Sequence, residues 1–203
     1  KKSTKTGSIT VVQNLNAVEQ LGITGGPVAG VEYTLAQIGS LCEITYTGGY
    51  MTGYAVEQWT AGTLGITDDA NYTGSHKDYC IYTSKATLEA LAKEIAKLET
   101  EDSQGQFPSG QTQKTNASGE TEFENLDYGL YLILQTDVSG AKYEDKPITL
   151  SHLQTPMLVS VPGEEGEIVT VNVKTPLGYG ELTKSIVGVG DINGNWENVE
   201  DSA

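Results

Sequence analysis

The sequence contains no arginine, and its twelve basic residues are all lysines, set against 27 acidic residues. The formal net charge is −15 over 203 residues. Proteins that bind nucleic acid or anionic membranes gather basic side chains on one face. A chain this acidic is expected to repel both, so we expect no nucleic-acid partner. The acidity is most simply explained as a source of solubility.

Histidine and cysteine are almost as scarce, with two of each. Cys42 and Cys80 match no metal-binding spacing and no redox motif. His76 and His152 lie far apart, and no catalytic or phosphate-binding motif occurs. We therefore expect no enzymatic activity, no metal and no cofactor. Cys42 and Cys80 either form a disulfide, if the compartment is oxidising, or remain separate thiols.

Long apolar runs are missing too, because none approaches the ~20 residues of a membrane span. Residues 1–7 are polar, with no hydrophobic region behind them, so no signal peptide is expected there. We expect a mature fragment with no membrane insertion.

What the sequence does contain favours strands and turns. Glycine (24 residues) is abundant, and tyrosine (11) far outnumbers phenylalanine (2). Threonine and tyrosine suit strands, and glycine suits the turns between them. Residues 22–30 read as a Gly/Pro-rich turn region. Short β-branched or alternating segments predict strands at residues 8–13, 31–38, 42–46, 122–126, 130–136, 158–161 and 168–174.

One helix is predicted over residues 84–99, where Leu88, Leu91, Ile95 and Leu98 share a face. Residues 48–77 read as a long insertion with little regular structure, and residues 100–119 as a polar loop. Many short strands with an inserted helix predict a mainly β protein, an immunoglobulin-like β-sandwich. We expect the domain to cover residues 1–176. Residues 177–203 are expected to hold a linker and the truncated start of a following domain, with its first strand near 182–188.

Residues 116–132 (NASGETEFENLDYGLYL) are the most specific stretch. They combine a polar turn, an aromatic strand, a Leu-x-x-Gly turn and Tyr-x-Leu. This pattern resembles the hallmark of Cna B-type domains of Gram-positive pilins and adhesins. The order of elements over about residues 7–185 is similar to that of an N-terminal pilin domain. The resemblance implies a Cna B-type β-sandwich with a long insertion carrying a helix.

Domains of this family often carry an internal isopeptide bond, which joins a first-strand lysine to an asparagine with help from a neighbouring glutamate. Here Gln13 stands near the position of the lysine, and Gln135 stands where the glutamate of the Tyr-x-Leu-x-Glu-Thr box would be. Glutamine is neither an acid nor a base. Asn172 is a candidate for the acceptor but would have no nucleophilic partner. We therefore predict no isopeptide bond within this domain, and Asn172 is expected to be an ordinary strand residue.

The family also implies a lysine that a sortase uses to join subunits, at the end of the domain's last strand. Lys174 lies at that strand end, although the order of lysine and proline in VNVKTP differs from the family's pattern. Lys184, in LTKSIV, resembles the isopeptide lysine of a following domain and is the next candidate. An exposed lysine with no such role is the alternative at both positions.

The resemblance thus implies a structural subunit of a covalently polymerised pilus, extracellular and anchored to the cell wall, that supports host adhesion. Its partners would be a pilus-specific sortase, neighbouring pilin subunits and a host surface ligand. An alternative is an ancillary pilin or adhesin that binds a host ligand through residues 48–82, which are rich in tyrosine. A second alternative, a secreted carbohydrate-active enzyme, would need paired carboxylates in a cleft. Nothing in the sequence indicates such a pair.

Overall fold

The computed structural model describes residues 4–46, 49–57, 79–82, 110–150, 157–178, 186–190 and 196–200. Its described elements are strands apart from one short 3-10 helix, η1. In chain order they are β1 (Thr6–Leu15), η1 (Glu19–Leu21), β2 (Gly26–Ala29), β3 (Glu32–Tyr46), β4 (Gly49–Glu57), β5 (Tyr79–Tyr82), β6 (Gln111–Lys114), β7 (Glu120–Asp127), β8 (Gly129–Asp137), β9 (Lys142–Tyr143), β10 (Lys146–Pro147), β11 (Met157–Val161), β12 (Ile168–Thr175), β13 (Ile186–Gly190) and β14 (Trp196–Glu200).

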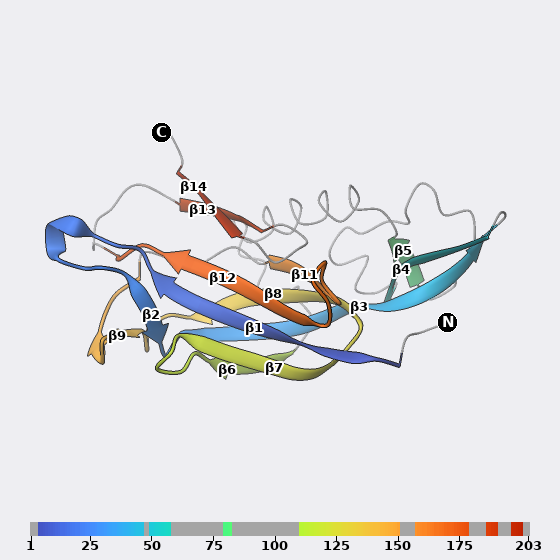
Figure 1. Ribbon diagram of the computed structural model, residues 1–203, viewed down its shortest axis with the longest axis horizontal. Helices are drawn as coiled ribbons and strands as arrows, with labels where there is room; N and C mark the ends of the chain where they lie inside the picture. The colour runs from blue at the N-terminus through green and yellow to red at the C-terminus, as the bar shows by residue number, and fades with distance from the viewer. Residues whose placement is uncertain are drawn as a thin grey trace.

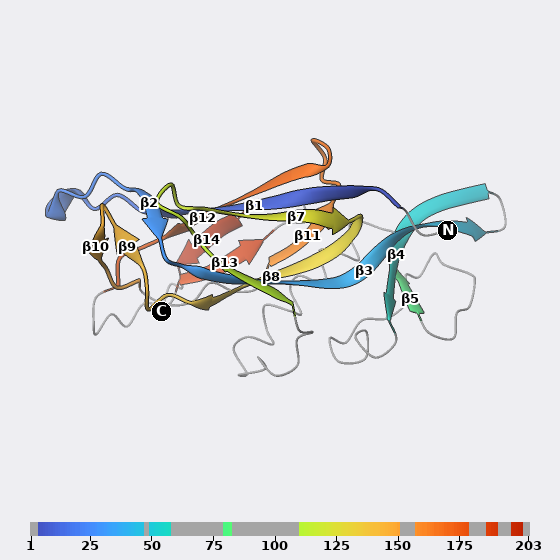
Figure 2. The ribbon, with the colours of Figure 1, turned by 90° about the horizontal axis from the view of Figure 1, so that it is seen from below.

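Two six-stranded sheets face each other (Figures 1 and 2). The first has the order β10-β9-β2-β1-β12, with β7 also paired to β1. The second has the order β11-β8-β3-β4-β5, with β6 also paired to β3. The predicted mainly β sandwich is therefore confirmed. The helix predicted over residues 84–99 lies outside the described residues.

The first and last strands of the sandwich run side by side in the same direction. β1 pairs with β12 in parallel from Ser8↔Ile168 to Leu15↔Thr175. The other edge of β1 pairs antiparallel with β7. A parallel pair cannot be closed by a short turn and needs a long connection. Here the connection contains the whole second sheet.

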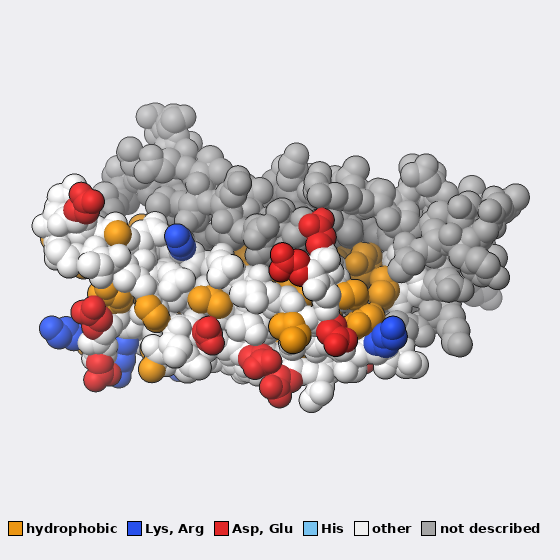
Figure 3. Space-filling view, in the orientation of Figure 1, with side chains coloured by type: hydrophobic (Ala, Val, Ile, Leu, Met, Phe, Trp, Pro, Cys, Tyr) orange, Lys and Arg blue, Asp and Glu red, His pale blue; other side chains and the backbone are white. Residues whose placement is uncertain are grey.

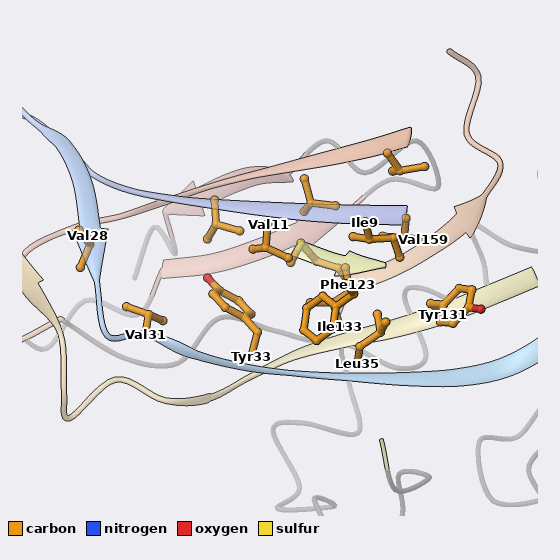
Figure 4. Close-up of a cluster of buried hydrophobic side chains, with 14 of the residues drawn as sticks. Ile9, Val11, Val28, Val31, Tyr33, Leu35, Phe123, Tyr131, Ile133 and Val159 are labelled. Atoms are coloured by element: carbon orange, nitrogen blue, oxygen red, sulfur yellow. The ribbon is translucent and has the colours of Figure 1, made fainter. Parts of the chain in front are cut away.

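The core lies between the sheets and follows the two-residue period of the strands. Figure 4 shows side chains from β1, β3, β7, β8 and β11 converging, with the hydroxyl of Tyr33 directed toward β1. The buried members include Ile9, Val11, Tyr33, Phe123, Ile133, Val159, Val169, Val171 and Val173. Each fully buried aliphatic or aromatic side chain stabilises the fold by about 1.5–3 kcal/mol.

β3 is longer than predicted because it serves two parts of the second sheet. Segments 31–38 and 42–46 were expected as separate strands, but they form one strand of 15 residues. Its first part pairs with β8 up to Gly39, and from Ser40 onward it pairs with β4. The register with β8 shifts between Gln37 and Gly39, where the strand changes partner.

Three other expectations are corrected. β4 lies in the insertion that was expected to have little regular structure, and β6 lies in the predicted loop at residues 100–119. β2 lies in the region read as a turn. β4 and β6 are stabilised by backbone pairing to β3, and β2 by pairing to β1 and β9. The residue patterns of these three strands do not indicate that pairing.

The C-terminal strands β13 and β14 form an antiparallel pair. β13 begins within the segment expected to open a further domain. The boundary at residue 176 stays a prediction. Within the described residues, no helix combines the length and apolarity needed to cross a membrane.

Candidate functional site: a buried polar cluster and a strand-end lysine

Gln13 lies on the core side of β1, in a row otherwise made of apolar side chains. Every second residue of the strand from Ile9 to Leu15 is buried, and Gln13 is 0% exposed. Burying a carboxamide without hydrogen bonds would cost several kcal/mol. Its partners therefore decide whether this position stabilises the fold.

Those partners come from both sheets and form one cluster with Gln13. The Tyr33 hydroxyl of β3 and the Gln135 Nε2 of β8 both donate to Gln13 Oε1, the second over 3.1 Å. Gln135 Nε2 also lies 3.0 Å from the Tyr33 hydroxyl oxygen. On the other side, Gln13 Nε2 donates to Thr175 Oγ1 of β12 over 2.9 Å. We call Gln13, Tyr33, Gln135 and Thr175 the polar cluster.

The polar cluster has no group that would exchange a proton near neutral pH. Glutamine does not titrate, and threonine carries only a hydroxyl. Burial raises the pKa of Tyr33 well above its ordinary value of 10.0, while the hydrogen bond from Gln135 opposes that shift only in part. The four side chains can hold the sheets together, but they lack the amine and the acid that amide-bond formation needs.

The structure thus brings Gln13 and Gln135 into direct contact. Asn172 does not join them. It lies on the exposed face of β12, since the buried residues of that strand are Val169, Val171, Val173 and Thr175. The residue of β12 that reaches Gln13 is Thr175, which the sequence interpretation missed. Counting in steps of two from Val171 would have found it.

Lys174 also lies on the exposed face of β12, one residue before the strand ends. Its neighbours Val173 and Thr175 are both buried in the core. The lysine backbone is therefore held by the sandwich while its side chain projects on the solvent side. Lys184, the second candidate, lies outside the described residues.

The segment that carries the family resemblance has a structural role in each of its turns. Asn116 Oδ1 accepts from the backbone N–H groups of Ser118 and Glu120 over 2.9 and 3.1 Å, which closes the polar turn. At Gly129 a Cβ would lie 2.2 Å from the carbonyl oxygen of Gly39, so only glycine fits between β8 and β3. The Tyr131 hydroxyl donates to the Asp127 carbonyl over 2.6 Å and ties β8 back to the turn.

Cys42 is a free cysteine, so the disulfide interpretation is wrong for the described structure. Its strand explains why. Cys42 is on β3 and pairs with Gly53 of β4, whereas Cys80 is on β5 and pairs with Val56 of β4. A whole strand therefore lies between the two backbones, which puts their Cα atoms at least about 9 Å apart. A disulfide needs Cα atoms within about 7 Å.

The tyrosine-rich insertion is described only in part. Tyr54 is half-buried, and its hydroxyl shares a hydrogen bond with Ser160 of β11. This tyrosine therefore packs against the sandwich rather than forming a free recognition surface. The side chains of Tyr46, Tyr50 and Tyr79, and all of Trp59 and Tyr72, lie outside the part that the structure describes.

No family model matches this chain, and no curated protein matches it. Solved structures do resemble it. The pilus 2b backbone protein of group B streptococcus is 12% identical, with a TM-score of 0.39 over 86% of this chain and 42% of that one. The major pilin SpaD of Corynebacterium diphtheriae is 17% identical, with a TM-score of 0.41 over 85% of this chain and 30% of that one.

The shaft pilin SpaA of Lactobacillus rhamnosus GG is 13% identical, with a TM-score of 0.41 over 90% of this chain and 53% of that one. The present chain therefore spans between about a third and about a half of the pilins it resembles.

Proposed function

We propose that this chain is the N-terminal part of a structural subunit of a sortase-assembled pilus, and that Lys174 is the lysine through which subunits are joined. The observation that carries the proposal is the position of Lys174. It is exposed at the end of the last strand of the sandwich, and the order of elements predicted from the sequence resembles that of N-terminal pilin domains.

The joining reaction needs only a lysine amine from this chain. The neutral Lys174 Nζ attacks the carbonyl carbon of a thioester that links the previous subunit to the sortase cysteine. The C–N bond forms, the C–S bond breaks, and the proton lost by the nitrogen is taken up by the departing thiolate. The chain is thus the substrate of an enzyme, and its own part is to hold the amine at a fixed place.

The backbone around Lys174 is held in a way that keeps the amine at a fixed place. β12 is fixed along its length by β1, and Thr175 is held by Gln13 Nε2 and by the Asn16 backbone N–H, which donates to the Thr175 carbonyl over 3.0 Å. A lysine beside such an anchor has a defined backbone, so less conformational entropy is lost on binding. The cellular setting that follows is a cell-wall-anchored pilus at the cell surface.

The test is a polymerisation assay with the full subunit and its pilus sortase. We expect a ladder of covalent multimers from the wild type and none from Lys174→Ala, while Lys146→Ala, which removes another exposed lysine, ladders like the wild type. A ladder that persists in Lys174→Ala and disappears in Lys184→Ala would move the link to the second candidate. No ladder from the wild type would favour an ancillary adhesin that binds a host ligand through residues 48–82.

A further inference from the structure

The exposed face of β12 forms a straight row that leads to Lys174. Ile168, Thr170, Asn172 and Lys174 are all exposed, because alternate strand residues point to the same side. Ile168 and Lys174 are six residues apart, which corresponds to about 20 Å along the strand. A protein that binds near Ile168 would therefore meet Lys174 at a fixed distance.

Ile168 is the most exposed large hydrophobic residue in the described part of the chain. Its side chain is 69% exposed, compared with 53% for Leu21 in η1. Isolated exposed hydrophobic residues are ordinary. Ile168 differs from Leu21 because it lies between two surface hollows and lines both.

Both hollows are lined by apolar and acidic side chains together. Tyr128 and Pro162 line one, Val169 and Asn172 line the other, and Glu165 lines both. Figure 3 shows apolar side chains bordered by carboxylates on this part of the surface. We call the following residues the Ile168 patch: Tyr128, Pro162, Glu164, Glu165, Glu167 and Ile168.

Hydrogen bonds fix the shape of the Ile168 patch. Gly163 and Gly166 exchange backbone hydrogen bonds of 2.8 and 3.3 Å across the turn between β11 and β12. The Tyr128 hydroxyl lies 3.2 Å from Glu167 Oε2. A preformed surface loses little entropy when a partner binds it.

We propose that the Ile168 patch is the docking surface for the sortase that joins subunits through Lys174. The complementary surface would carry an apolar side chain for the hollow beside Ile168 and basic side chains facing Glu164, Glu165 and Glu167. The proposal rests on the proposed function of Lys174. It explains how one lysine of the twelve is selected, since the row on β12 sets the distance between the docking point and the amine.

Charge and apolar contact would contribute differently. The three carboxylates would attract a basic partner over a distance and raise the rate of encounter, an effect that salt screens. Ile168 would act at short range and slow dissociation, as buried apolar anchors at the centre of an interface do. The two contributions can therefore be separated by changing the ionic strength.

The test compares initial laddering rates of the full subunit at limiting sortase. Ile168→Ser is expected to ladder at least about fivefold more slowly than the wild type, the effect of losing one significant interface contact. Glu164→Gln/Glu165→Gln is expected to slow laddering at low salt and to match the wild type at high salt. Leu21→Ser removes the other large hydrophobic side chain that is exposed among the described residues, and it is expected to have no effect. Ile168 is exposed, so its replacement should leave the thermal unfolding midpoint unchanged.

A binding measurement separates this proposal from the one it rests on. A sortase with its catalytic cysteine replaced by alanine is expected to bind the wild type and Lys174→Ala equally, and Ile168→Ser at least about fivefold more weakly. If Ile168→Ser binds and ladders like the wild type while Lys174→Ala does not ladder, the docking surface is refuted and the role of Lys174 stands. If Ile168→Ser weakens binding but Lys174→Ala still ladders, the docking surface stands and the linking lysine is another.

Discussion

Removing the Gln13 carboxamide should destabilise the sandwich strongly, although Gln13→Leu preserves the size of the side chain. The Tyr33 hydroxyl proton loses its acceptor in the core, which costs about 1–3 kcal/mol. The two other hydrogen bonds between side chains, from Gln135 and to Thr175, are lost at about 1 kcal/mol each. The sum is about 3–5 kcal/mol, a large share of the roughly 5–15 kcal/mol typical of a domain.

The assay is urea unfolding followed by circular dichroism. With a slope of about 2 kcal/mol per molar urea, the midpoint should fall by roughly 2 M. Gln111→Leu is the matched control, because this glutamine is exposed on β6, and its replacement should change the free energy of unfolding by less than about 0.5 kcal/mol.

A multiple variant tests the reasoning more sharply than the single one. Gln13→Leu alone leaves the Tyr33 hydroxyl and Gln135 Nε2 without their acceptor, Gln13 Oε1. The triple variant Gln13→Leu/Tyr33→Phe/Gln135→Leu removes both donors together with that acceptor. Replacing both partners of a buried hydrogen bond by apolar groups is often nearly neutral. The triple variant should therefore be at least about 2 kcal/mol more stable than the sum of its single effects predicts. Strict additivity, or a cost below about 1 kcal/mol for Gln13→Leu, would refute the account of the polar cluster.

Three further outcomes are expected. Gln13→Lys/Gln135→Glu/Thr175→Asn places an amine, an acid and a carboxamide in the polar cluster, so an internal amide bond should form. Mass spectrometry should then show the loss of one ammonia. An unchanged mass would count against the match between these three positions and the lysine, glutamate and asparagine of the family. Gly129→Ala should lower stability by more than about 2 kcal/mol in thermal unfolding because its Cβ would meet backbone. Gly22→Ala has open space around its Cβ but a left-handed φ of 66°, so it should lose only about 1–2 kcal/mol. Because burial raises the pKa of Tyr33 in the folded state, the unfolded state loses its proton first, so stability should decline as the pH rises above about 10, and this decline should be shallower in Tyr33→Phe.

The sandwich could be predicted from the sequence because its first and last strands, β1 and β12, alternate between buried and more exposed residues. In β1 and β12 every second residue is buried, and all of these residues except Gln13 are apolar or small. β4 was missed because Gly49–Glu57 mixes glycine, tyrosine and threonine without a clear period, and its pairing with β3 supplies what its own residues do not. The break expected between residues 38 and 42 is a change of pairing partner and not an end of the strand.

The candidate site was half predictable for a related reason. Gln13 and Gln135 were found because they interrupt motifs that carry other residues in the family. Thr175 was missed because the expected acceptor of an isopeptide bond is a carboxamide, which Asn172 carries. A threonine on an apolar face gives no such signal, and its role becomes visible only through the hydrogen bond from Gln13.

If subunits are joined at Lys174, the position of this lysine also determines which part of the chain carries tension. In a fibre joined at this lysine, pulling force would enter at its side chain and leave through Thr175 into the chain that follows β12. The pulling force would therefore not pass through the sandwich formed by the preceding residues. A covalent bond between the first and last strands resists force only if force passes through both of them. The single hydrogen bond from Gln13 to Thr175 is then sufficient where a loaded domain would need a crosslink.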